Sequence, residues 1–560
     1  MEKILLVEPN YKNKYPPIGL MKISTYFKNK GDFVEFHKGI MPVREVQTFD
    51  KVLITTLFTF DFNMCVNTIN YYVEIVGIQN VFVGGIAATI MPEKFKEEIP
   101  GIQLLLGQMT SSNVLGYSDN VNVDVLELDY DMLWDTSYNY PAADSYFIYT
   151  TRGCPRKCTF CAVKTLEPEF YDCNNITSQV QRVDQRFGIK RDLLIMDNNI
   201  LYSEHFYDSI DEIKTLGFGV NNNRIKRNNP VKYYLISLRQ RVGEKRKYGN
   251  LLARINGEID GIKYTRVCKK DIEFLDRLKQ KRDHEKQWVK TLLENEQSIT
   301  DIFDRYYYHK IARHVDFNQG LDARLFTNQK AKKMAEIAIK PCRIAFDNLA
   351  TKNDYFKAMD SAVRNGITHF SNYLLYNYNE KPEDLWVRLE LNIKFCQKHR
   401  DKKISLFSFP MKYASIEHTD RKYVGKYWHK KYLRAINVIL NVTSGVVPKE
   451  DDLFYRAFGN NLEEYMDILV MPDEFIRFRD FFEEKGLTHI WRKLYHELKA
   501  DDKATLIDIL DGMVDDPESL DYDYGSQINE VLDLYKIKKK KVESNALYYS
   551  NFCNRILNRR

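Results

Sequence analysis

The sequence has few of the features that mark secreted, membrane-embedded or repetitive proteins. Its 560 residues contain only nine cysteines, an odd and sparse number that argues against a disulfide framework. No apolar run is long enough to cross a bilayer, and the first residues lack the basic-then-apolar pattern of a signal peptide. There is no internal repeat and no long low-complexity segment. We therefore expect a soluble cytoplasmic protein with three or four structural units.

Three of the cysteines stand close together, at Cys154, Cys158 and Cys161 in the run TTRGCPRKCTFCAV. Thiolates are the usual ligands of iron–sulfur clusters, and three on one short loop can hold three corners of a [4Fe–4S] cube. The fourth iron then lacks a protein ligand and is open to a small molecule. A structural zinc site is the alternative, but it needs four ligands, and no fourth Cys or His lies near this loop. The other six cysteines form no second close-spaced set, which argues against an auxiliary cluster.

This C-x3-C-x2-C spacing, with the aromatic Phe160 before the last cysteine, resembles the hallmark of the radical S-adenosylmethionine (SAM) superfamily. The resemblance implies that Cys154, Cys158 and Cys161 ligate a [4Fe–4S] cluster and that SAM chelates the open iron. It also implies that SAM is cleaved to a 5′-deoxyadenosyl radical, which requires a one-electron reductant such as flavodoxin or ferredoxin. The alternative from another class is a non-catalytic iron–sulfur protein that binds or senses nucleic acid.

Strand-like and helix-like segments alternate around and after the cysteine motif. Six apolar runs read as strands, and helix-period segments lie between most of them; the runs are 147–149, 193–196, 314–317, 343–346, 369–375 and 404–409. Six such units predict a parallel sheet that curls toward a partial barrel, with active groups at the carboxyl ends of the strands. The superfamily resemblance implies the same (β/α)6 shape, and we assign residues 141–415 to it.

Polar residues follow several of these predicted strands. Their functional interpretation is hydrogen bonding to the ribose, carboxylate and amino group of SAM, or to the substrate. Arg324 is the natural partner for a carboxylate, because a guanidinium group can bind it bidentately. Any single Asn or Asp here can equally be a turn residue or a helix cap, but their recurrence favours a polar site. The candidate residues are Asp197, Asn198, Asn199, Asn318, Gln319, Asp322, Arg324, Asp347 and Asn377.

Residues 1–140 are predicted to form a separate, doubly wound Rossmann-like α/β domain. The runs YPPIGL and VFVGG resemble the cobalamin-binding-type N-terminal domain of one radical SAM class. Many cobalamin proteins carry a D-x-H-x-x-G loop after the first strand, whereas the loop here, from Glu8 to Asn13, has no histidine. Two alternatives stay open: bound cobalamin, which would favour methyl transfer, or an empty domain that serves as a substrate platform.

Positive charge is concentrated where the alternation is interrupted. Residues 221–313 hold 23 Lys and Arg against 12 Asp and Glu, whereas the whole chain has 83 against 77. Basic residues neutralise phosphates and aromatic rings stack on bases, so this basic, partly helical insertion predicts contact with nucleic acid or another polyanion. The alternative is a solvated helical hairpin whose Lys and Arg face water. Residues 416–560 are predicted to be mostly helical, without a functional interpretation.

Overall fold

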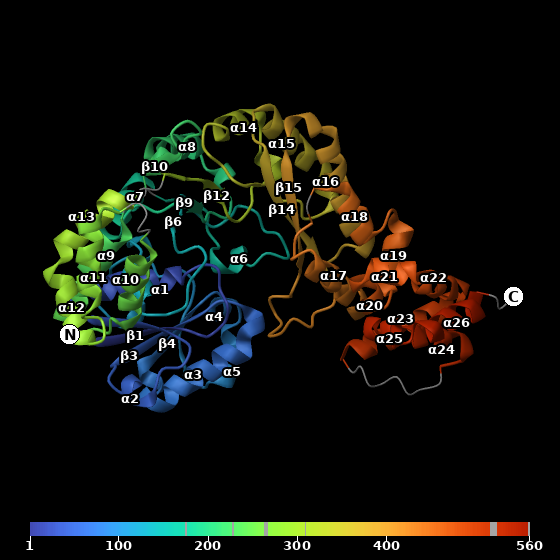
Figure 1. Ribbon diagram of the computed structural model, residues 1–560, viewed down its shortest axis with the longest axis horizontal. Coiled ribbons are helices and arrows are strands. Elements are labelled where there is room, and N and C mark those ends of the chain that lie inside the picture. The colour runs from blue at the N-terminus through green and yellow to red at the C-terminus, as the bar shows by residue number, and fades with distance from the viewer. Residues whose placement is uncertain are drawn as a thin grey trace. The chain divides into compact units, whose positions relative to one another are not determined.

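The computed structural model describes residues 1–173, 176–226, 229–262, 267–307, 310–447, 449–515 and 524–557. Helices and parallel strands are combined along the chain, so the predicted mixed α/β class is confirmed (Figure 1). Among the described residues, no helix has both the length and the apolar character that a membrane crossing requires. The chain divides into two compact units: Met1–Leu321 with Gln329–Lys340 and Ser415–Arg421, and Asp322–Asn328 with Pro341–Ala414 and Lys422–Arg560.

A five-stranded parallel sheet opens the first unit, in the spatial order β2-β1-β3-β4-β5. Leu5 and Val7 of β1 lie in one buried cluster with Ile69 and Tyr72 of α3, because alternate residues of a strand face the same side. This strand order places a topological switch point between β1 and β3, where ligands bind in such sheets. The main elements are β1 (Lys3–Glu8), α1 (Ile18–Asn29), β2 (Phe33–Lys38), β3 (Lys51–Thr56), α3 (Phe62–Val76), β4 (Val81–Gly85), α5 (Pro92–Glu98) and β5 (Gln103–Leu105).

A second parallel sheet of the first unit has three strands, in the order β12-β9-β6. Helix α7 follows β6 and buries Val180, Val183 and Phe187, which share one helical face. A short antiparallel hairpin of β7 and β8 leaves the end of β6 and carries the cysteine motif between its strands. The bounds are β6 (Ser145–Ile148), β7 (Thr151–Arg152), β8 (Tyr171–Asp172), α7 (Ile176–Phe187), β9 (Asp192–Ile195), α8 (Phe206–Ile213) and β12 (Val315–Phe317).

The described residues within 221–313 form a largely helical excursion between α8 and β12. The antiparallel strands β10 (Arg224–Lys226) and β11 (Lys310–Ala312) pair at its base. Its helices enclose a core of their own, in which Trp288 is 1% exposed. The five helices are α9 (Pro230–Gly243), α10 (Gly249–Gly261), α11 (Lys269–Lys279), α12 (Glu285–Glu294) and α13 (Glu296–Tyr306).

The second unit contains the parallel sheet β13-β14-β15. Helix α16 begins with a proline in its first turn and with Glu383 and Asp384, whose charges favour the positive end of the helix dipole. The six strands predicted for one sheet therefore lie in two three-stranded sheets, one in each unit. The elements are α14 (Asn328–Met334), which spans the boundary between the units, β13 (Cys342–Arg343), α15 (Lys352–Arg364), β14 (His369–Tyr376), α16 (Pro382–Lys398) and β15 (Ser405–Lys412).

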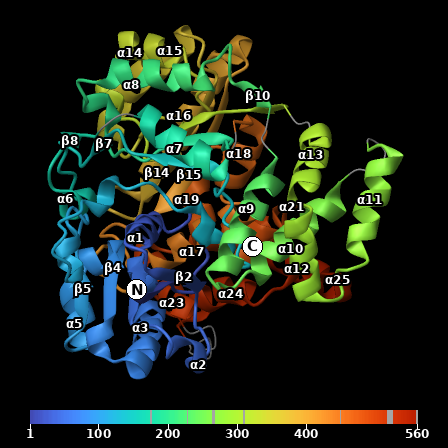
Figure 2. The ribbon, with the colours of Figure 1, turned by 90° about the vertical axis from the view of Figure 1, so that its left-hand side faces the viewer.

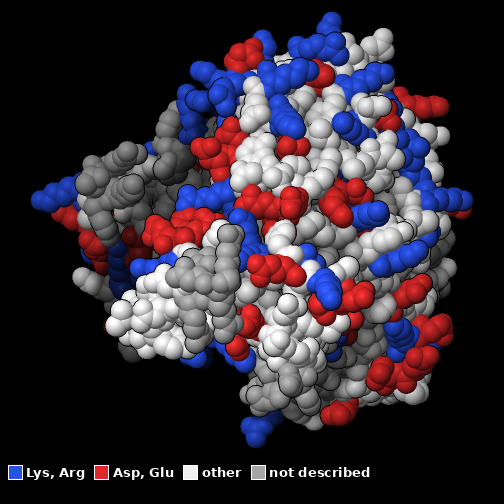
Figure 3. Space-filling view, turned by 90° about the vertical axis from the view of Figure 1, so that its right-hand side faces the viewer, with Lys and Arg blue, Asp and Glu red and all other residues white. Residues whose placement is uncertain are grey.

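The rest of the second unit is helical wherever the structure describes regular elements. On the face that Figure 3 shows, Lys and Arg side chains are intermixed with Asp and Glu. The helices are α17 (Lys430–Val442), α18 (Asp451–Phe458), α19 (Leu462–Val470), α20 (Asp473–Arg477), α21 (Arg479–Glu484), α22 (Leu487–Glu497), α23 (Ala500–Asp515), α24 (Ser526–Tyr535), α25 (Lys539–Ser544) and α26 (Ala546–Leu557).

Candidate functional site

The three motif cysteines lie on the loop that follows β7 and leads into α6 (Val163–Leu166). Gly153 starts this loop with φ +70°, and a Cβ atom there would lie 1.9 Å from the Glu169 carbonyl oxygen, so only glycine fits. The Cys161 N–H donates to the Cys158 carbonyl at 3.1 Å, which closes a turn between the two. All three thiols and Phe160 are half-buried.

The sulfur of Cys154 accepts two hydrogen bonds. The Arg156 backbone N–H donates to it at 3.4 Å, and the Asn199 side-chain amide donates to it at 3.7 Å. Asn199 is 5% exposed, and its Oδ1 atom has no hydrogen-bond partner among the described residues. Asn199 is thus the predicted site residue that the structure brings directly to the motif.

Asn198 reaches the same loop through Glu167. One oxygen of Glu167 accepts from the Gly153 N–H at 2.7 Å and from the Asn198 amide at 2.8 Å. The other oxygen forms an ion pair with Arg152 at 3.1 Å, and Arg152 also pairs with Asp124 at 3.0 Å. Glu167 and Arg152 were not predicted as site residues from the sequence. The position of Arg152, directly before Gly153 and the cysteine motif, could have indicated a role near the loop.

Asp197 fixes the entry to the loop from the end of β9. Its carboxylate accepts the Thr150 backbone N–H at 2.7 Å and the Thr150 hydroxyl. Burial raises the pKa of Asp197 to about 6, against the opposing effect of hydrogen bonds from Thr150 and Thr151. Asp197 therefore connects two strand ends, and both of its carboxylate oxygens already accept hydrogen bonds from Thr150.

Asn318 and Gln319 follow β12 and differ in environment. Asn318 is buried, and its side-chain oxygen accepts the Tyr15 hydroxyl at 2.6 Å. Its backbone N–H donates to the Ile195 carbonyl at 3.1 Å, which places it beside the end of β9. Gln319 is exposed. Of this pair, the structure holds only Asn318 at the strand ends of the first unit.

The remaining four predicted residues belong to the second unit. Arg324 donates from Nε to one oxygen of Asp322 at 2.7 Å and from Nη2 to the other at 3.2 Å, which occupies the fork proposed for a ligand carboxylate. Burial raises the pKa of Asp347, while the charges of Arg388 and Arg324 act in the opposite direction. Asn377 is fully buried with φ +68°, and its side chain makes three hydrogen bonds to backbone groups: Tyr413 and Tyr423 carbonyls at 3.0 Å and the Gly425 N–H at 2.8 Å.

Arg388 of α16 organises these strand ends and was not identified in the sequence. Its fully buried guanidinium donates to the carbonyls of Phe346 at 3.0 Å, Asp347 at 2.9 Å and Leu375 at 2.6 Å. Of the predicted strand 343–346, only Arg343 lies in β13, and the carbonyl of the last residue in the run, Phe346, accepts from Arg388. The nine polar candidates are thus divided between the two units.

The donor set of the motif fits a [4Fe–4S] cluster. Three half-buried thiols lie within eight residues, and Cys154 already receives N–H donors of the kind that stabilise cluster sulfurs. Among the described residues, no group of three or more His, Cys, Asp or Glu side chains is arranged to hold a single metal ion. A [4Fe–4S] cube does not need several ligands on one ion, because each thiolate binds a different iron atom. Burial raises the pKa of the nearby Cys173 to about 12.

The polar residues at the switch point between β1 and β3 bind one another. Glu8, at the end of β1, is 1% exposed and pairs with Lys38 at 2.6 Å. The Tyr140 hydroxyl also donates to Glu8. Gly85 is required by its own sheet, since a Cβ there would lie 2.3 Å from the Thr56 carbonyl oxygen. These groups satisfy one another without a ligand, and cobalamin binding stays a prediction.

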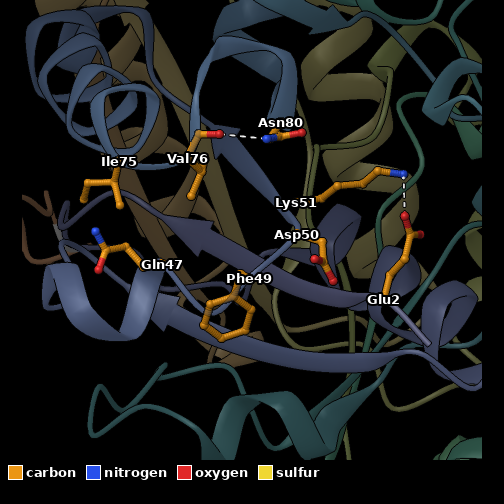
Figure 4. A pocket seen from close by; sticks show the side chains of 8 residues that line it. All are labelled: Glu2, Gln47, Phe49, Asp50, Lys51, Ile75, Val76 and Asn80. Atoms are coloured by element: carbon orange, nitrogen blue, oxygen red, sulfur yellow. Dashed lines mark hydrogen bonds and ion pairs between the residues drawn. The ribbon is translucent and has the colours of Figure 1, made fainter.

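A pocket of ≈630 Å³ in the first unit lies at the opposite edge of the same sheet (Figure 4). Lys51 begins β3 and pairs there with Glu2 at 3.1 Å. Ligands of parallel α/β sheets bind beyond the carboxyl ends of the strands, so a pocket at the amino ends is not where chemistry is expected. Its lining residues are Glu2, Gln47, Phe49, Asp50, Lys51, Ile75, Val76 and Asn80.

Comparison with known proteins adds no family to these observations. No protein-family model matches the chain, and no curated protein matches it. The functional interpretation therefore depends on the residues around the cysteine loop.

Proposed function

We propose that this protein is a radical SAM enzyme that holds a [4Fe–4S] cluster on Cys154, Cys158 and Cys161 and modifies a large anionic substrate. The observation that carries the proposal is the half-buried three-cysteine loop in which Cys154 receives two N–H donors. In this proposal, β6, β9, β12, β13, β14 and β15 correspond to the six strands of a partial (β/α)6 barrel. The five-stranded sheet corresponds to the doubly wound, Rossmann-like N-terminal domain.

When bound, the cluster and SAM supply a 5′-deoxyadenosyl radical after one-electron reduction, by a protein such as flavodoxin or ferredoxin. The three thiols of the chain bind the cluster, and the Arg156 N–H and the Asn199 amide stabilise the negative charge of the Cys154 sulfur. The buried Oδ1 of Asn199 has no hydrogen-bond partner among the described residues, so in this proposal it accepts a hydrogen bond from the bound molecule. Asp197 and Glu167 fix the loop, so its geometry is set before any ligand arrives.

Cobalamin has no part in this proposal; Glu8, at the end of β1, is already paired with Lys38 and Tyr140. We therefore expect hydrogen abstraction without a cobalamin-dependent methyl transfer. In this proposal the N-terminal sheet acts as a platform, and Tyr15 from the loop after β1 contacts Asn318 at the strand ends beside the motif.

The test is anaerobic reconstitution of the full chain with iron and sulfide, followed by dithionite and SAM. We expect about four iron atoms per chain and formation of 5′-deoxyadenosine. Cys158→Ala should lose both, whereas Cys268→Ala, an exposed cysteine outside the motif, should keep both. Full iron content without 5′-deoxyadenosine would identify a non-catalytic iron–sulfur protein instead. Stoichiometric zinc with no iron would reject the cluster itself.

A further inference from the structure

Part of the positive charge of residues 221–313 fixes these helices to the rest of the first unit. Arg241 is fully buried and forms ion pairs with Asp131 at 3.1 Å and with Asp135. Arg246 pairs with Asp131 at 3.1 Å, and Lys247 pairs with Glu35 at 2.9 Å. These acidic partners lie outside the insertion, and Arg246 also lies 3.7 Å from Glu244 within it. These cations are therefore structural, and they account for some of the charge asymmetry that is evident in the sequence.

Other cations surround a pocket of ≈640 Å³ between the end of α9, the start of α10 and α12. Four of its nine lining residues are Lys or Arg and one is acidic. The Lys245 and Lys286 ammonium groups have no hydrogen-bond or ion-pair partner among the described residues, whereas Lys290 lies 3.7 Å from Glu294. The lining residues are Val242, Lys245, Arg246, Tyr248, Lys286, Val289, Lys290, Leu293 and Glu294.

Arg246 also lines this pocket, but acidic residues already compensate its charge. Its side chain is only 4% exposed; Nη1 binds Asp131 at 3.1 Å, and Nη2 lies 3.6 Å from Asp135. Its Nε and Nη2 groups are buried and have no hydrogen-bond acceptor among the described residues. The cations that a ligand can reach are therefore the lysines. Lys245, in the adjacent turn, has φ +57°, a conformation that a residue with a side chain seldom adopts.

Three of the lining residues are apolar and are called the floor here: Val242, which is 39% exposed, Val289 and Leu293. Tyr248 adds an aromatic ring to the lining. Free cations beside an apolar and aromatic surface match the two parts of a nucleotide, a phosphate and a flat base. A metal ion would instead require several acidic or imidazole ligands.

The pocket lies away from the cysteine loop within the first unit. In Figures 1 and 2, α9, α10 and α12 group on one side of this unit, whereas α6, which ends the cysteine loop, lies apart from them. A ligand that reaches both places must be long. A base enters a pocket only when it is unstacked, which favours a single strand over a duplex.

We propose that this pocket binds one nucleotide of a single-stranded nucleic acid, with the base on the apolar floor and the phosphates beside Lys245 and Lys286. Binding itself needs neither cluster nor SAM. Only the further step, that this nucleic acid is the substrate, rests on the proposed function.

The test is fluorescence anisotropy with full-length protein and a labelled 20-nucleotide single strand of mixed sequence, at several salt concentrations. We expect affinity that falls steeply with salt, and a loss of about tenfold or more in Lys245→Glu/Lys286→Glu with a salt slope smaller by about 2. Lys232→Glu is the matched control, because Lys232 is an exposed lysine of α9 outside the pocket; it should change affinity less than about twofold. Leu293→Asn should weaken binding severalfold by disturbing the floor.

Several results would overturn the inference. Equal losses in the Lys232→Glu control, or equal affinity for heparin, would indicate a general polyanion surface without a base pocket. Equal affinity for the duplex would remove the single-strand preference, and equal affinity for AMP would identify a small nucleotide as the ligand. Binding should be unchanged in Cys158→Ala, so a failure of the proposed enzyme activity and a failure of this site give different outcomes.

Discussion

The two three-stranded parallel sheets have similar polar residues at their strand ends but use them differently. In the first unit, the carboxylates of Asp197 and Glu167 accept N–H groups from the chain that enters the cysteine loop. In the second unit, the guanidinium of Arg388 donates to strand-end carbonyls. The first arrangement fixes a loop that carries three thiols. The second arrangement satisfies the strand-end carbonyls with a side chain of the same unit.

Two asparagines illustrate the difference. Asn199 donates to a cysteine sulfur and keeps a buried oxygen without a partner. The Asn377 side chain forms hydrogen bonds with three backbone groups, and its own backbone is in a left-handed conformation. Both follow predicted strands. A polar residue at a strand end is therefore a candidate for ligand binding only when the fold leaves it a donor or acceptor.

The largest effect is expected from Arg388→Leu. Removing the guanidinium leaves buried carbonyls of Phe346, Asp347 and Leu375 without their donor, so we expect a stability loss of about 3–5 kcal/mol. Lys394→Leu on the same helix is the control, since Lys394 is exposed and pairs only with Glu390; about 0.5 kcal/mol is expected. Denaturant unfolding followed by tryptophan fluorescence measures both. If Arg388→Leu left stability unchanged but weakened SAM binding, Arg388 would serve ligand binding in the second unit instead of satisfying its strand-end carbonyls.

Asp197→Asn should change how stability depends on pH. Burial raises the pKa of Asp197 from 3.8 to about 6, so the folded state holds this proton more tightly than the unfolded state. The stabilising contribution is present below about pH 4 and is lost as pH rises through 6, on the order of 2–3 kcal/mol. Cys173, the neighbouring titratable group, stays neutral in this range because burial raises its pKa to about 12.

The measurement is the free energy of unfolding of both proteins from pH 4.5 to 7.5. Wild type should lose stability relative to Asp197→Asn as pH rises. The variant keeps an acceptor for the Thr150 N–H, so its fold should be preserved. Parallel profiles would show that Asp197 is not held in this buried position.

Asn199→Ala tests the strand ends of the first unit, where a side chain contacts the cysteine motif. Loss of one N–H donor to the Cys154 sulfur should lower the cluster reduction potential, by about 20–40 mV if the hydrogen bond contributes about 0.5–1 kcal/mol. Iron content should be unchanged, because all three thiols remain. Spectroelectrochemical titration measures the potential, with exposed Gln319→Ala as the control. Equal potentials in all three proteins would remove Asn199 from the site.

The sequence was informative where a local pattern determines structure. Apolar runs predicted the strands β9, β12, β14 and β15 to within a few residues, and the cysteine spacing located the loop. It was uninformative where the structure depends on partners distant along the chain. Arg388 lies on a helix 41 residues after Asp347, to whose carbonyl it donates, and nothing local marks it as buried.

The same reason limited the prediction of the insertion. Its net charge was evident, but the burial of Arg241 and Arg246 depends on Asp131 and Asp135, about 110 residues earlier in the chain. A count of charges cannot separate an anchoring arginine from a free one. The unpaired Lys245 and Lys286 became visible only when the structure assigned partners to their neighbours.

The smallest effect is expected from Arg324→Ala. Arg324 is 39% exposed and pairs with Asp322 two residues earlier, and exposed ion pairs contribute about 0–1 kcal/mol, so stability should change by no more than that. SAM binding to reconstituted protein, measured by equilibrium dialysis, should be unaffected, because the guanidinium fork is already occupied by Asp322. Arg324→Lys keeps the charge but not the fork and serves as the control. A SAM affinity reduced tenfold in Arg324→Ala and only partly restored in Arg324→Lys would make Arg324 the carboxylate partner after all, and the strand ends of the second unit would then be as open to ligand as those of the first.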